Sequence, residues 1–142
     1  MIPVLARLTA LTLLVGLAVS GCGKDDEPVD RGGTSAATTL EVRVVAADGA
    51  EPRTMTLSCA PVGGDHPNAP AACAKLAEAG APIFKPVPAS TTCTTIFGGP
   101  QTATISGTYE GEEVDASFNR ANGCEIDRWD TLGTEVFDIP LQ

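Results

Sequence analysis

The chain has 142 residues, 18 Asp and Glu against 9 Lys and Arg, a formal net charge of -9, and only 4% aromatic residues. A chain this acidic has no basic patch to neutralise phosphates, so composition argues against a nucleic-acid partner. The same charge repels anionic lipid head groups.

The first 21 residues are predicted to be a cleaved export signal. Arg7 and the terminal amine supply a positive start, residues 8–17 form an apolar stretch of about 10 residues, and small residues precede Cys22. A bilayer span takes about 20 apolar residues, so this stretch is too short to stay as an anchor. Removal of Arg7 with the signal would change the net charge from -9 to -10.

Cys22 follows a sequence that resembles a bacterial lipobox, Val19-Ser20-Gly21-Cys22. This predicts lipidation of Cys22, with the membrane contacted only through acyl chains, each buried methylene contributing about 0.8 kcal/mol. The alternative is an ordinary signal cut nearby that leaves a free Cys22. We therefore expect an exported protein, held at the outer face of the cell membrane by lipid, or secreted if Cys22 is not lipidated.

Residues 22–38 are predicted to form a flexible tether behind that cysteine. They combine charged, Gly, Ser and Thr residues and hold almost no large apolar side chain. Such a linker reaches on the order of 20 to 25 Å. Residues 39–142 then form one small domain.

Alternating apolar and polar residues predict several strands in this domain. Residues 40–46 and 53–58 alternate on either side of a turn at Asp48-Gly49, and residues 102–109 and 113–119 alternate on either side of a turn at Glu110-Gly111. A final strand is predicted at residues 135–139.

One helix is predicted between these strands. Asn68 can cap it, Pro70 suits its first turn, residues 71–79 are rich in helix formers, and Gly80 marks its end. Strands in antiparallel order with a helix on one face indicate an α+β fold.

The domain holds four of the five cysteines, Cys59, Cys73, Cys93 and Cys124. Four cysteines allow three disulfide pairings, between which the sequence alone does not choose. Structural zinc is disfavoured, because its ligand pairs usually lie two to four residues apart, whereas neighbouring cysteines here are separated by 13, 19 and 30 residues. We expect no metal and no cofactor.

The residues offer little for catalysis. His66 is the only histidine, it lies in a turn-rich segment, and no Gly-x-Ser-x-Gly motif is present. We expect His66 to bond to nearby backbone, and we do not interpret the chain as an enzyme.

Residues 91–100 form a threonine-rich segment that ends in Gly98-Gly99-Pro100. Threonine and isoleucine are stiff at χ1 and favour extended backbone. A constrained extended segment can bind in a protease cleft as an added edge strand. The alternative is an ordinary β-strand that ends in a turn.

Several motifs in order resemble the Streptomyces subtilisin inhibitor family across nearly all of residues 39–142. The matching segments are Thr56-Leu57-Ser58-Cys59-Ala60-Pro61, Gly64-Asp65-His66-Pro67, Ala72-Cys73-Ala74-Lys75-Leu76, Cys93-Thr94-Thr95-Ile96-Phe97, Gly107-Thr108-Tyr109-Glu110-Gly111, Phe118-Asn119-Arg120-Ala121-Asn122-Gly123-Cys124-Glu125 and Val136-Phe137.

The resemblance implies a five-stranded antiparallel sheet covered by two helices, usually in a homodimer. It also implies the disulfides Cys59–Cys73 and Cys93–Cys124. The function it implies is inhibition of subtilisin-like or trypsin-like serine endopeptidases by a reactive loop, whose residues would be Thr92, Cys93, Thr94, Thr95, Ile96 and Phe97.

Carried over by position, Cys93 is P3, Thr94 is P2, Thr95 is P1 and Ile96 is P1′. The Thr95–Ile96 bond would then lie in the active site of a secreted serine protease. An inhibitor of this kind binds as a substrate does but is turned over poorly, so it needs no catalytic residue of its own.

Two features differ from the family pattern. Gly98-Gly99-Pro100 stands where the family typically has Asp-Pro, and we expect glycine to loosen the backbone there. Thr95 is smaller than the large apolar or basic P1 residues that these proteases prefer. The alternative function is therefore a surface lipoprotein that uses the inhibitor fold as a non-inhibitory structural or binding module.

Overall fold

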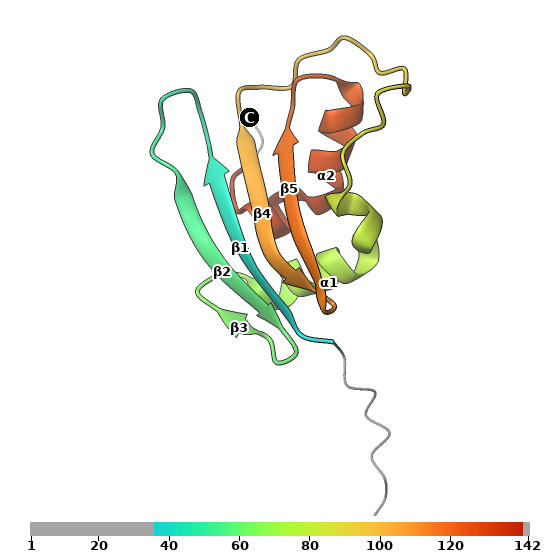
Figure 1. The fold of residues 1–142 in the computed structure, drawn as a ribbon. Coiled ribbons are helices and arrows are strands. Elements are labelled where there is room, and N and C mark those ends of the chain that lie inside the picture. Colours follow the sequence, from blue (N-terminus) through green and yellow to red (C-terminus); the bar gives the residue numbers. More distant parts are fainter. Residues whose placement is uncertain (1–35, 141–142) are drawn as a thin grey trace, which may run out of the picture. The chain divides into compact units, whose positions relative to one another are not determined.

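The computed structural model describes residues 36–140, so the predicted signal, Cys22 and most of the tether lie outside the described residues. Figure 1 shows the chain as one sheet with helices packed against it. The elements in chain order are β1 (Thr38–Val45), β2 (Arg53–Cys59), β3 (Gly63–Gly64), α1 (Ala69–Ala79), the 3-10 helix η1 (Ala81–Phe84), β4 (Thr102–Tyr109), β5 (Glu112–Asn119) and α2 (Gly123–Phe137).

The five strands form one antiparallel sheet in the order β3-β2-β1-β4-β5. Both α-helices pack on the same face of this sheet (Figure 1). The structure also contains two disulfides, Cys59–Cys73 and Cys93–Cys124. The predicted α+β class, the five-stranded sheet, the two helices and the disulfide pairing are therefore confirmed.

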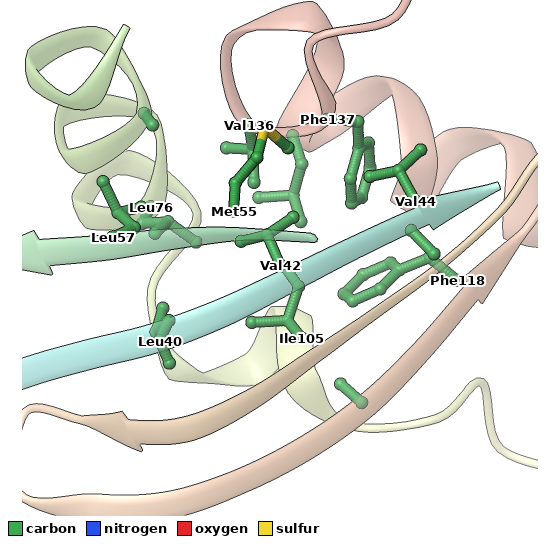
Figure 2. Packing of buried hydrophobic residues seen from close by; sticks show 14 of the residues in the cluster. Leu40, Val42, Val44, Met55, Leu57, Leu76, Ile105, Phe118, Val136 and Phe137 are labelled. Carbon is green, nitrogen blue, oxygen red and sulfur yellow. The ribbon is translucent and has the colours of Figure 1, made fainter. Parts of the chain in front are cut away.

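The alternation that predicted the strands follows from burial of one sheet face. In β1, Leu40, Val42 and Val44 are buried, while Thr39, Glu41 and Arg43 between them are exposed. Because successive side chains of a strand point to opposite faces, the apolar set faces the helices. Figure 2 shows these side chains meeting residues from β2, β4, β5 and the helices in one core.

Helix α1 begins and ends close to the predicted positions. Pro70 lies in its first turn, and the backbone N–H of Gly80, at φ +67°, donates to the Leu76 carbonyl. Asn68 holds the N-cap position, but its side chain makes no capping hydrogen bond. The Cys59–Cys73 disulfide joins the end of β2 to this helix.

The strand predicted at residues 135–139 is wrong, because α2 extends to Phe137. Its buried residues Trp129, Leu132 and Val136 recur at intervals of three and four, which is the helical period. The helix contains a break at Gly133, whose φ of 59° and ψ of -161° are not helical. The fifth strand is instead β3, which is too short to show any alternation.

His66 is buried and bonds to backbone on both sides of its ring, as expected. Nδ1 accepts from the backbone N–H of Asn68 at 3.1 Å, and Nε2 lies 2.9 Å from the carbonyl oxygen of Val136. Since one nitrogen accepts, these partners assign the ring proton to Nε2. The histidine therefore joins the turn before α1 to the last turns of α2.

Within residues 36–140, no helix combines the length and the apolar character needed to cross a membrane.

Asp65 connects the turn after β3 to β2. One of its carboxylate oxygens accepts hydrogen bonds from the backbone N–H and the hydroxyl of Thr56. These donors hold the pKa of Asp65 below its ordinary value of 3.8, because they favour the ionised form. A depressed carboxyl pKa contributes stability above the ordinary pKa, and that stability is lost as the pH falls through the folded-state pKa.

We predict that Asp65→Asn lowers the thermal midpoint at neutral pH and that its deficit shrinks below the ordinary pKa of Asp65. The asparagine keeps an acceptor oxygen but carries no charge that protonation can remove. Thermal unfolding of wild type and variant from pH 7 downward measures this. Asp115→Asn, an exposed position on β5 with the same charge change, is the control. An equal deficit for Asp65→Asn at every pH would contradict the prediction.

Candidate functional site

The threonine-rich segment lies in the long connection between η1 and β4, drawn in yellow in Figure 1. None of residues 91–100 belongs to a strand or helix. The alternative of an ordinary β-strand is therefore wrong, since the segment pairs with no strand of the sheet.

Four consecutive residues of this segment, 94–97, are exposed. Thr94 and Thr95 are exposed, and Ile96 and Phe97 expose 56% and 71% of their surface. Among residues 36–140 only one other large apolar side chain, Val62, is comparably exposed. Two neighbouring apolar side chains left in solvent are typical of a surface that binds another molecule.

Two attachments hold the N-terminal side of the exposed residues. Cys93 is joined by its disulfide to Cys124 in the first turn of α2, with the two Cα atoms 5.4 Å apart. The carbonyl oxygen of Thr94 accepts from the backbone N–H of Gly123 at 3.0 Å. The start of α2 therefore fixes both the position and the direction of the chain as it enters the exposed part.

Two hydrogen bonds hold the C-terminal side, and both go to Arg120. The N–H of Gly98 donates to the Arg120 carbonyl at 2.8 Å, and the Nε–H of Arg120 donates to the Gly98 carbonyl at 3.0 Å. The Arg120 side chain is only 11% exposed and pairs with Asp130 of α2 at 2.6 Å. Both backbone polar groups of Gly98 are thus satisfied by one residue.

Between these attachments, the backbone N–H and C=O groups are left without partners in the described part of the chain. Within residues 36–140, Thr95, Ile96 and Phe97 make no backbone hydrogen bond to another part of the chain. Their N–H and C=O groups can therefore pair with the edge of a partner's strand. The site consists of three exposed residues whose two ends are held against the protein.

The expected loosening by glycine does not apply to Gly98. A Cβ atom there would lie 2.8 Å from Cδ1 and Cγ1 of Ile126 and 3.1 Å from Nε of Arg120. Glycine is present because the backbone passes closely over α2. Gly99, at φ +129°, adopts a backbone conformation that other residues rarely reach.

Residues outside the threonine-rich segment support the loop, and their role is not evident from the sequence. Arg120, Ile126 and Asp130 all contact the loop or orient its support, and they lie 22 or more residues after Gly98. The only available signal was the arginine in the segment before the fourth domain cysteine.

Both ring nitrogens of His66 are engaged by backbone, and in the described part of the chain no cluster of His, Cys, Asp and Glu is placed to hold a metal.

We predict that Gly98→Ala destabilises the protein by about 1 to 3 kcal/mol, because the added methyl overlaps Ile126 and overpacked sites lose stability in that range. Gly63→Ala is the matched control, since a Cβ there meets nothing within 4 Å. Urea unfolding of both variants measures the difference. A Gly98→Ala protein as stable as Gly63→Ala would show that Ile126 moves aside without cost.

Comparison with known proteins places the chain in a family. A family model described as subtilisin inhibitor-like matches residues 35–122. The chain is 36% identical over 98 residues to subtilisin inhibitor-like protein 1 of Streptomyces cacaoi, covering 66% of this chain and 88% of that protein. It is 39% identical over 77 residues to the subtilisin inhibitor of Streptomyces violaceus, covering 52% of each.

Among solved structures, the chain is similar to sermetstatin of Streptomyces caespitosus, crystallised in complex with Bacillus licheniformis subtilisin. The sequence identity is 28%, the TM-score is 0.45, and the match covers 71% of this chain and 96% of that one. The two relatives in the sequence comparison are named as a subtilisin inhibitor-like protein and a subtilisin inhibitor. From the family model and the Streptomyces cacaoi relative, the chain belongs to the subtilisin inhibitor-like family.

Proposed function

We propose that this protein inhibits serine endopeptidases of the subtilisin or trypsin type by binding them as a substrate does, with Thr95–Ile96 as the reactive bond. The observation that carries the proposal is the exposed segment from Thr95 to Phe97, which has free backbone groups and is held at both ends. Membership in the family and the inhibitor names of its relatives support the same activity.

In this proposal Cys93, Thr94 and Thr95 occupy P3 to P1, and Ile96 and Phe97 follow the reactive bond. The loop backbone would add to an edge strand of the protease, and the Thr95 carbonyl oxygen would point into the oxyanion hole. Because the loop is already ordered by its attachments, little conformational entropy is lost on binding. The exposed Ile96 and Phe97 add apolar contact on the leaving-group side.

Thr95 sets the choice of protease in this arrangement. A small β-branched P1 residue fills little of a deep pocket, so binding depends more on the backbone and on the residues after the bond. A basic side chain at this position would instead reach the acidic base of a trypsin-type pocket.

We predict that Thr95→Lys strengthens inhibition of trypsin by at least about tenfold, because a buried ion pair of this kind contributes more than about 1.4 kcal/mol, which corresponds to a factor of ten in affinity. We also predict that Thr95→Pro abolishes inhibition of subtilisin and trypsin. Titration of the purified domain against both enzymes measures the two effects. Thr54→Lys, an exposed threonine on β2, is the charge-matched control and should leave trypsin inhibition unchanged.

Circular dichroism of Thr95→Pro shows whether the variant is folded when it is assayed. Failure of the folded wild-type domain to inhibit any serine protease tested would contradict the proposal. That result would favour the non-inhibitory surface module instead.

We further propose that lipid on Cys22 holds the domain at the outer face of the cell membrane, which would place the inhibitor where secreted proteases reach the cell. The support is the lipobox-like sequence, and Cys22 lies outside the described residues. The expected mass of the native N-terminal peptide includes diacylglycerol on Cys22, and Cys22→Ser should move the protein from the membrane fraction to the medium. An unmodified Cys22 in the native protein would contradict the anchor.

A homodimer stays a prediction from the family resemblance. The sheet face opposite the helices carries polar side chains, among them Thr39, Glu41 and Arg43 of β1. A dimer formed through that face would have to pair these groups across the interface.

A further inference from the structure

We infer that Arg120 is a positioning residue that holds the leaving-group side of the reactive loop in place after a protease attacks Thr95. This inference rests on the proposed function. It adds a specific role for one residue, because Arg120 belongs neither to the loop nor to a disulfide.

Both sides of the proposed reactive bond are attached to one short segment, residues 120–124. The side before the bond is joined to it by the Cys93–Cys124 disulfide and by the hydrogen bond from Gly123 to Thr94. The side after the bond is joined only through Gly98, whose two hydrogen bonds both go to Arg120. A covalent link secures the first side, whereas the second depends on Arg120.

The Arg120 side chain is fixed well enough to serve as such a support. It is 11% exposed, and its NH1 group lies 2.6 Å from a carboxylate oxygen of Asp130. Its Cζ atom lies 6.0 Å from the ring centroid of Trp129, which is fully buried in the core. Both of these neighbours belong to α2, so the helix determines where the guanidinium points and therefore where it meets Gly98.

The position of Gly98 matters when the protease cleaves the Thr95–Ile96 bond and the bond forms again. The serine Oγ of the protease bonds to the Thr95 carbonyl carbon, the bond from that carbon to the Ile96 nitrogen breaks, and the serine proton ends on the Ile96 amine. In the reverse step this amine attacks the acyl carbon, the Oγ bond breaks and the proton returns to the serine. No other reactant is consumed. Hydrolysis competes only if the amine leaves and water replaces it.

Gly98 is two residues from that amine. Two residues span at most about 7 Å, so a fixed Gly98 keeps the amine close to the acyl carbon. Loss of the Arg120 side chain removes one of the two bonds to Gly98 and leaves the backbone bond from Gly98 N–H to the residue 120 carbonyl. The amine is then less well placed, and misplacement of a reacting group by about 1 Å can cost a factor of about 100 in rate.

The test compares Arg120→Ala with Arg43→Ala, which removes the same charge from an exposed position on β1. Each full-length domain is incubated with an equimolar amount of subtilisin. Mass spectrometry then follows cleavage at Thr95–Ile96, and the inhibition constant is measured in parallel. We expect Arg120→Ala to be hydrolysed about ten times faster than wild type or Arg43→Ala, and Arg120→Lys, which keeps the charge, to be intermediate.

Hydrogen exchange of the Gly98 amide in the free inhibitor gives a second readout, and we expect it to be faster in Arg120→Ala than in Arg43→Ala. A role in stability alone would lower the thermal midpoint without changing cleavage at temperatures where the variant is fully folded. Cleavage and Gly98 exchange equal to those of Arg43→Ala would overturn the inference while the proposed function stood. A wild-type domain that subtilisin simply digests would overturn both.

Discussion

The attachment of the exposed loop to the segment that begins α2 is the constraint on which the proposed inhibition depends. The loop has no regular secondary structure of its own, so its shape comes from residues 120–124. That segment is fixed in turn because Asn122 caps α2 by accepting from the Glu125 N–H at 3.0 Å. Helix α2 is held by Trp129 and Leu132, which are fully buried against the sheet. The core thus fixes the position of the loop through the N-terminus of α2.

Three of the few aromatic residues help to hold α2 against the sheet. The domain has few of them, yet Phe118, Trp129 and Phe137 meet where α2 packs on β5, with ring centroids 4.3 and 5.4 Å apart. Such pairs add about 0.5 to 1.5 kcal/mol beyond the burial of their area. Arg128 lies over the Phe118 ring and donates to the Ile83 and Ser117 carbonyls, which ties η1 and β5 to the same helix. These contacts fix α2, the helix whose first turn holds the loop, against the sheet and η1.

A small core of this kind gains from covalent links. The two disulfides join residues 14 and 31 positions apart, and each would contribute about 3 to 4 kcal/mol in the chain-entropy model. The two disulfides hold different parts of the domain. Cys59–Cys73 holds α1 to the sheet, and Cys93–Cys124 holds the loop to α2. In the proposed inhibition, the second link would serve the activity and the first the fold.

The sequence by itself determined most of the sheet and the first helix. Alternation in β1, β2, β4 and β5 reflects one buried face, and Gly80 ends α1 because the chain turns there with a positive φ. The order of the cysteine motifs also indicated the family and the loop. The strand and helix patterns depend on residues close together in the chain, where side-chain pattern and backbone preference act directly.

Only the tertiary structure decided α2, β3 and the support of the loop. Val136 and Phe137 are residue types that favour strands, and the break at Gly133 separates them from the helical spacing of Trp129 and Leu132. A strand of two residues has no period to recognise. Gly98 looked like a flexible residue because its partners, Arg120 and Ile126, are distant in sequence. Whether a glycine loosens a chain or lets it pack closely depends on what lies across from it, and that is set by the fold.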